Sequence, residues 1–160
     1  MKRLNQQVAI VTGAGRGIGK AVASHYAREG AKVVIAELDE TLGENLAQEL
    51  TNTGAKALFI KTDISQVGDI EALTAATRKH FGSIDILVNN AAVTRSLDFF
   101  EVSEADWDWI HSVSSRGLFF CMQSVARVMK EQGHGSIVNI ASIAGKGYPS
   151  TSNIAYAGAK

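Results

Sequence analysis

The last five residues of the chain have the spacing of a proton-transfer pair. Tyr156 lies four residues before Lys160, and on a helix such positions share one face. The Lys160 ammonium would then lie beside the Tyr156 phenol and favour its ionised form. A phenol in water ionises only near pH ~10, so acid–base work at neutral pH needs such help. Tyr26 and Tyr148 have no lysine four residues on, but the spacing alone also fits an incidental surface pair.

Length and composition indicate one domain with an ordinary core. Of the 160 residues, 46% are hydrophobic. Lysine plus arginine and aspartate plus glutamate each number 16, so the zero net charge gives no reason to expect a nucleic acid or a membrane surface as partner. Cys121 is the only cysteine, which excludes an intrachain disulfide and a cysteine-based metal site. The four histidines lack metal-ligand spacing, so no metal site is predicted. Without a signal peptide or a membrane-spanning run, the expected location is cytoplasmic.

Short apolar runs alternate with helical patterns along the chain. The runs have strand length and no polar alternation, which favours parallel strands covered on both faces. They are residues 8–11, 33–36, 57–60, 84–88 and 136–140. Apolar residues at helical spacing fill residues 18–28, 40–51, 67–81 and 104–131. This order predicts an α/β fold with an open, doubly wound, Rossmann-type parallel sheet.

Local signals mark the ends of these predicted helices. Glycine follows them at the usual left-handed cap position, at Gly30, Gly54, Gly82 and Gly133. Ser103 and the acidic residues after it fit a helix N-cap. On the first predicted helix, Ile18, Val22 and Tyr26 recur every four residues and mark its apolar face.

A glycine-rich turn, residues 12–19, joins the first predicted strand to the first predicted helix. It reads Thr-Gly-Ala-Gly-Arg-Gly-Ile-Gly. Glycine permits a tight turn and a close backbone approach, and a helix N-terminus attracts a pyrophosphate. The alternative is a turn that only packs helix on strand. Ala14 and Ala21 exclude a P-loop, and Ile18 breaks the Gly-x-Gly-x-x-Gly pattern, which leaves Gly13-x-x-x-Gly17-x-Gly19.

This turn resembles the cofactor turn of the short-chain dehydrogenase/reductase family, Thr-Gly-x-x-x-Gly-x-Gly. Three further motifs follow in the family's order. The segment from Asn89 to Ala92 is similar to Asn-Asn-Ala-Gly, with alanine in the last place. Residues 136–142 resemble the strand that delivers a catalytic serine, and Tyr156 with Lys160 resembles the catalytic pair. The resemblance covers essentially all 160 residues.

The resemblance implies reversible hydride transfer between a nicotinamide cofactor and an alcohol or carbonyl carbon. Tyr156 would be the general acid or base, Lys160 would assist it, and Ser142 would hydrogen-bond the substrate oxygen. The alternative for Ser142 is a turn serine that caps a backbone group. The family's catalytic asparagine aligns with Ser114, whose side chain is shorter. The implied cofactor-binding residues are Gly13, Arg16, Gly17, Ile18, Gly19, Glu37, Asp63, Ile64, Asn90, Ala91, Tyr156 and Lys160.

The end of the second predicted strand bears on the choice of cofactor. Glu37 stands where a carboxylate accepts from the ribose 2′-hydroxyl of NAD and repels the 2′-phosphate of NADP. Leu38 offers no positive charge to that phosphate, whereas Arg16 could pair with it. Glu37 and Leu38 together outweigh Arg16, so NAD is favoured over NADP as the cofactor.

The resemblance also predicts the length of the whole protein. Members of the family run to about 250 residues, a common size for one α/β domain. We therefore expect residues 1–160 to be the N-terminal two-thirds of a single NAD(P)-binding domain whose sheet lacks its last strands, with little activity as a 160-residue chain. The full-length protein is expected to be a homodimer or homotetramer that acts on a small alcohol or ketone. The alternative is a non-catalytic dinucleotide-binding protein or an inactive fragment, through Ser114 and the missing part.

Overall fold

Five parallel strands form one sheet in the computed structural model, which describes residues 2–147 and 153–160; Tyr148 lies outside these residues. The strand order is β3-β2-β1-β4-β5 and every pairing is parallel. The strands are β1 (Val8–Thr12), β2 (Lys32–Glu37), β3 (Ala57–Lys61), β4 (Ile86–Asn89) and β5 (Ser136–Asn139). The chain winds from β1 outward to β3 and then returns to the other side of β1. The predicted doubly wound α/β fold is confirmed.

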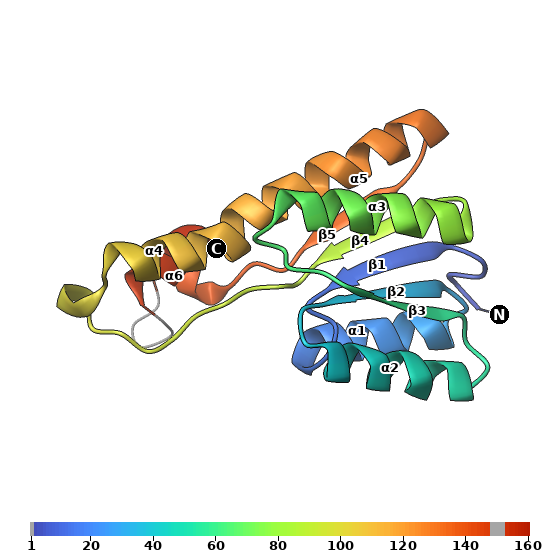
Figure 1. Ribbon diagram of the computed structural model, residues 1–160, viewed down its shortest axis with the longest axis horizontal. Coiled ribbons are helices and arrows are strands. Elements are labelled where there is room, and N and C mark those ends of the chain that lie inside the picture. Colours follow the sequence, from blue (N-terminus) through green and yellow to red (C-terminus); the bar gives the residue numbers. More distant parts are fainter. Residues whose placement is uncertain (1, 148–152) are drawn as a thin grey trace.

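Helices cover both faces of the sheet (Figure 1). Helices α1 (Gly17–Arg28) and α2 (Glu40–Asn52) lie on one face, and α3 (Val67–Phe81) and α5 (Leu118–Gln132) lie on the other. Successive strand residues point to opposite faces, so Val11 packs with the first helix pair and Ile10 with the second. The four predicted glycine caps all have positive φ. Because all five strands are parallel, the loops that follow them lie at one end of the sheet.

Exposure of the sheet edges corrects one prediction. The central strands β1 and β4 are buried throughout, as their continuous apolar runs predict. The prediction that the last run is covered on both faces is wrong, because β5 is largely exposed and Val138 is 42% exposed. Strand β5 pairs only with β4 among the described residues, and of its side chains Ile137 packs against the α3 and α5 core cluster. An edge position leaves little of an apolar strand in contact with helices.

The long helical pattern of residues 104–131 folds as three consecutive segments. Helix α4 (Glu104–His111) begins at Ser103, whose hydroxyl and the Asp106 carboxylate form a reciprocal capping box. A π-helical turn, η2 (Ser112–Gly117), then leads into α5. Figure 1 shows α4 extending beyond the carboxyl ends of the strands. A single helix was predicted here, and a π turn inserts a wider turn without interrupting the apolar face.

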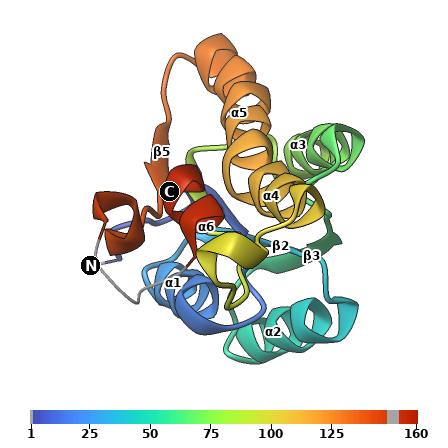
Figure 2. The same ribbon diagram turned by 90° about the vertical axis from the view of Figure 1, so that its left-hand side faces the viewer.

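Short elements complete the end of the molecule beyond the strands. They are the 3-10 helices η1 (Phe99–Glu101) and η3 (Ile143–Lys146) and the helix α6 (Ile154–Ala159). Figures 1 and 2 both place α6 beside α4, and the two helices are in contact. No helix within residues 2–147 and 153–160 is long and apolar enough to cross a membrane.

The π turn makes a close backbone contact that a methyl group would break. A Cβ at Gly117 would lie 2.3 Å from the Ile64 carbonyl oxygen. We expect Gly117→Ala to lower the free energy of unfolding by about 1–3 kcal/mol, because backbone must move. Urea denaturation measures this change. Gly68→Ala is the control, since nothing lies within 4 Å of its Cβ and alanine suits a helix better. Equal stability of Gly117→Ala and the wild type would contradict the contact.

Candidate functional site

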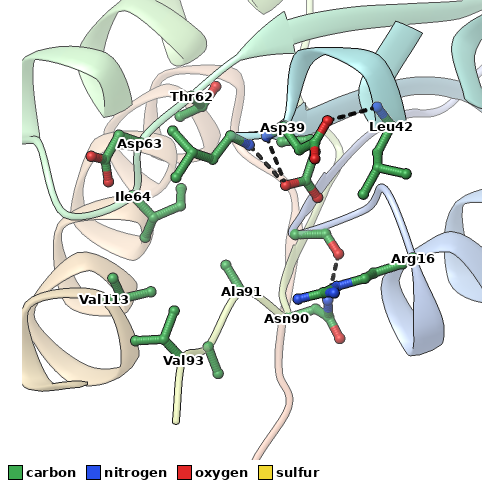
Figure 3. A pocket seen from close by; sticks show the side chains of 15 residues that line it. Arg16, Asp39, Leu42, Thr62, Asp63, Ile64, Asn90, Ala91, Val93 and Val113 are labelled. Atoms are coloured by element: carbon green, nitrogen blue, oxygen red, sulfur yellow. Dashed lines mark hydrogen bonds between the residues drawn. The ribbon is translucent and has the colours of Figure 1, made fainter. Parts of the chain in front are cut away.

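A cavity of about 650 Å³ opens at the carboxyl ends of the strands. It lies where the chain order reverses between β1 and β4, the usual ligand position in an open α/β sheet. Its volume is in the range of small-molecule sites. Figure 3 shows side chains from the loops after four strands and from the π turn around it. The lining residues are Gly13, Arg16, Ala36, Glu37, Leu38, Asp39, Leu42, Thr62, Asp63, Ile64, Asn90, Ala91, Ala92, Val93 and Val113.

The structure gathers most of the predicted cofactor-binding residues at this cavity. Those that line it are Gly13, Arg16, Glu37, Asp63, Ile64, Asn90 and Ala91. Gly17, Ile18 and Gly19 lie in the first turn of α1, and Tyr156 and Lys160 lie at α6, apart from the cavity lining. Ile18 is 61% exposed, so its predicted place on the apolar face of the helix is wrong. The buried face of α1 runs through Gly19, Ala23 and Ala27, so Ile18 lies on the side that faces away from the sheet.

Hydrogen bonds of one threonine join the glycine turn to the loop after β4. The buried Thr12 hydroxyl accepts from the backbone N–H groups of Asn90 and Ala91, at 3.0 Å each. In return, Asn90 Nδ2 donates to the carbonyl oxygens of Thr12 and Gly13, also at 3.0 Å. A Cβ at Gly19 would lie 2.2 Å from the Gly13 oxygen, so this junction requires glycine there. Thr12 was absent from the predicted site residues, although it begins the turn motif.

The Glu37 carboxylate holds the opposite side of the glycine turn. Its Oε2 accepts from the Gly15 N–H at 2.8 Å, and its Oε1 accepts from the N–H groups of Leu38 and Asp39 at 2.9 and 3.2 Å. Asp39 in turn caps α2 by accepting from Leu42 N–H. Figure 3 shows the bonds of Leu38, Asp39 and Leu42 along one rim of the cavity. The turn is therefore fixed to the ends of both neighbouring strands.

Apolar side chains and an acidic turn form the far wall. Ile64 and Val93 face the cavity from the loops after β3 and β4, and Val113 faces it from the π turn (Figure 3). The Asp63 carboxylate accepts from the backbone N–H and the hydroxyl of Ser65, at 2.9 and 2.7 Å. This wall combines apolar side chains with a polar turn, as is usual for small-molecule sites. Val113 and Val93 were not predicted, since only the folded chain brings the π turn to this loop.

The remaining predicted catalytic residues lie on elements that contact one another. Helix α6, which carries Tyr156, packs against α4, the π turn and η3. The Ser142 hydroxyl accepts from Ala144 N–H at 3.2 Å and so caps η3. The Lys160 ammonium donates to the Ile140 carbonyl oxygen and lies 6.0 Å from the Tyr156 ring centroid. Burial lowers the pKa of Lys160.

Ser114 connects the π turn, against which α6 packs, to the loop after β4. It is buried in the π turn, and its hydroxyl accepts from the backbone N–H of Val93 at 3.3 Å. Val93 lines the cavity, and so does Val113, the neighbour of Ser114.

Within residues 2–147 and 153–160, no group of three or more histidine, cysteine, aspartate or glutamate side chains is placed to hold a metal ion.

Comparison with known proteins agrees with this geometry. Residues 7–160 match the family model of the short chain dehydrogenases. The chain belongs to the short-chain dehydrogenase family. It is 36% identical over 162 aligned residues to a 3-oxoacyl-[acyl-carrier-protein] reductase from Synechocystis sp., covering 100% of this chain and 65% of that one. It is 38% identical over 145 residues to a galactitol 2-dehydrogenase from Agrobacterium fabrum, covering 90% of this chain and 56% of the relative.

A solved structure of a family member superposes closely. The crystal structure of a protein assigned as a short-chain alcohol dehydrogenase from Sinorhizobium meliloti has a TM-score of 0.92 and 34% identity, and the match covers 98% of this chain and 62% of that chain. The present chain thus spans less than two thirds of its relatives' lengths. Short-chain dehydrogenases are oxidoreductases that bind nicotinamide dinucleotides, and the cavity lies where an open α/β sheet binds such ligands.

The junction made by Thr12 gives a stability test. Thr12→Val keeps the side-chain shape but leaves two backbone N–H groups without their acceptor. We expect the free energy of unfolding to fall by about 1–3 kcal/mol. Thr77→Val is the matched control, because its buried hydroxyl only donates to the Leu73 carbonyl of its own helix. Urea denaturation of both variants decides; equal losses would show that the junction has no special weight.

Proposed function

We propose that this protein is the N-terminal part of an NAD-dependent oxidoreductase that moves a hydride between the cofactor and an alcohol or carbonyl carbon. The observation that carries the proposal is that one π turn contacts both the cavity and the helix that carries Tyr156. Its Val113 lines the cavity, and α6 with Tyr156 packs against the same turn. The predictions of a cytoplasmic location and of a homodimer or homotetramer belong to this proposal.

The residues around the cavity suit a dinucleotide. The glycine turn and the first turn of α1 would hold the pyrophosphate with backbone N–H groups. The Glu37 carboxylate, with about four acceptor positions of which three are used, would accept from a ribose hydroxyl. The same negative charge would repel a 2′-phosphate, which favours NAD; Arg16, which also lines the cavity, is the group that would favour NADP.

Three residues, Tyr156, Lys160 and Ser142, would handle the proton. The nicotinamide, when bound, supplies or accepts the hydride. Tyr156 would donate a proton to the substrate oxygen in reduction and remove it in oxidation. The Lys160 ammonium, which lies 6.0 Å from the Tyr156 ring centroid, would stabilise the phenolate. The Ser142 hydroxyl, which accepts from Ala144 N–H, would donate its hydrogen to the substrate oxygen.

Replacement of the tyrosine tests the acid–base step. In the full-length protein, Tyr156→Phe removes the transferable proton, and we expect kcat to fall by about 10²-fold or more. Absorbance of NADH with a panel of secondary alcohols and ketones measures turnover. Tyr26→Phe is the control, since Tyr26 packs against the α1 and α2 core cluster. Wild-type turnover in Tyr156→Phe would remove the assigned role.

Ser114 supports a second candidate, a dinucleotide-binding protein without catalysis. It occupies the place of the family's catalytic asparagine, and its hydroxyl already accepts from Val93 N–H. Calorimetry separates the two candidates. Binding of NADH without turnover on the substrate panel supports the second, whereas binding with turnover supports the first.

The choice between the two dinucleotides depends on Glu37. We expect the wild-type protein to bind NADH at least ~10-fold more tightly than NADPH, because Glu37 repels the extra phosphate. Glu37→Ala removes that charge and the acceptor of Gly15 N–H. The affinities for NADH and NADPH should then both fall, and the ratio of NADPH affinity to NADH affinity should rise. Glu44→Ala on the outside of α2, away from the cavity lining, is the control. An unchanged ratio in Glu37→Ala, measured by calorimetry, would contradict the assignment.

A further inference from the structure

The side chain of Asn153 makes hydrogen bonds in two directions at the start of α6. It is 5% exposed. Its Oδ1 accepts from the backbone N–H of Tyr156 at 2.9 Å and so caps the helix. Its Nδ2 donates to the carbonyl oxygen of Arg95 at 2.7 Å and lies 3.3 Å from Thr94 Oγ1. One buried amide thus connects the backbone of the predicted catalytic tyrosine to the loop after β4.

The far end of this connection is anchored on α4. The Arg95 guanidinium pairs with Oδ1 of the buried Asp106 carboxylate and lies 5.6 Å from the centroid of the Trp109 ring. The other Asp106 oxygen accepts from Ser103 in the capping box at the start of α4. Arg95 therefore directs its charge to α4 and its carbonyl group to Asn153. The loop after β4 is held between two helices.

Helix α6 depends on such outside contacts for its orientation. It has only six residues, and a helix of that length is not stable by its own backbone bonds. It packs against α4, the π turn and η3, of which η3 is largely exposed. The groups that hold the first turn of α6 therefore help to set the position of the Tyr156 side chain relative to α4.

We propose that Asn153 is a positioning residue for Tyr156, acting together with Arg95 as a clamp between α6 and α4. The proposal rests on the proposed oxidoreductase function, since the clamp matters for turnover only if Tyr156 transfers the proton. Its role exceeds that of a helix cap, because the amide also ties the helix to the loop whose Val93 lines the cofactor cavity. The clamp thereby sets the distance between the acid–base group and the cofactor.

Two substitutions separate the clamp from the cap. Asn153→Ala removes both hydrogen-bonding functions. Asn153→Asp keeps an acceptor for Tyr156 N–H but has no N–H to offer the Arg95 carbonyl oxygen, which the carboxylate would repel. Thr74→Ala is the matched control, because Thr74 is a buried polar side chain with two hydrogen bonds far from the site, to Ile70 and Ser124.

The experiment uses the full-length protein and four measurements: kcat, KM for substrate, the NADH dissociation constant and hydrogen exchange at the Tyr156 amide. We expect kcat to fall ~10-fold or more in both Asn153 variants, since small misplacements of a catalytic group cost this much. The NADH dissociation constant should change less than ~2-fold, because neither variant replaces a residue that lines the cavity. Exchange at the Tyr156 amide should accelerate in Asn153→Ala and stay slow in Asn153→Asp. Thr74→Ala should keep kcat despite lower stability.

Several results would overturn the clamp. Wild-type kcat in Asn153→Asp would reduce Asn153 to a cap, and a loss in Asn153→Ala no larger than in Thr74→Ala would make it merely structural. If Asn153→Ala does not fold, Asn153→Asp carries the same kcat test. Absence of turnover in the wild type would instead reject the proposed function. The clamp would then be judged by exchange alone, and unchanged protection of the Tyr156 amide in Asn153→Ala would reject it.

Discussion

The hydrogen bonds between Thr12 and the Asn90–Ala91 backbone are the join on which the cavity depends. Strands β1 and β4 are neighbours, but the chain leaves them toward opposite faces of the sheet, so ladder bonds stop at their ends. Side-chain bonds must then hold the two loops together. The Thr12 hydroxyl accepts from one loop while Asn90 donates back to the other. Gly13, Asn90 and Ala91 keep their places around the cavity because this join is buried and reciprocal.

The two halves of the site are held by different physical means. The cofactor side is built on strands with buried side chains, and its loops are closed by short hydrogen bonds to backbone groups. The side of Tyr156 is built from the short helices α4, α6 and η3 and the π turn. Polar contacts of Ser114, Arg95 and Asn153 join these elements to the loop after β4 and to one another. Positioning in this half is therefore sensitive to single polar substitutions.

Sequence periodicity was sufficient for the fold, and the glycine-turn motif with the family resemblance indicated much of the cavity. Continuous apolar runs identified every strand, and the spacing of Gly13 and Glu37 indicated two sides of the cavity. The burial of β5 was wrongly predicted, because an apolar run does not reveal whether anything packs on it. The π turn was missed since one extra residue per turn barely alters a helical pattern. Leu42 and Val113 reach the cavity only through tertiary packing, which spacing along a chain cannot express.

Under the proposed function, the Glu37 carboxylate couples the choice of cofactor to the architecture of the turn. Its oxygens accept from Gly15, Leu38 and Asp39, so the group that would read the ribose also fastens the glycine turn to the end of β2. Removal of the charge would relieve repulsion of a 2′-phosphate and, at the same time, release the turn that holds the pyrophosphate. A change of cofactor preference at this position therefore requires a replacement acceptor for the Gly15 N–H as well as a new positive charge.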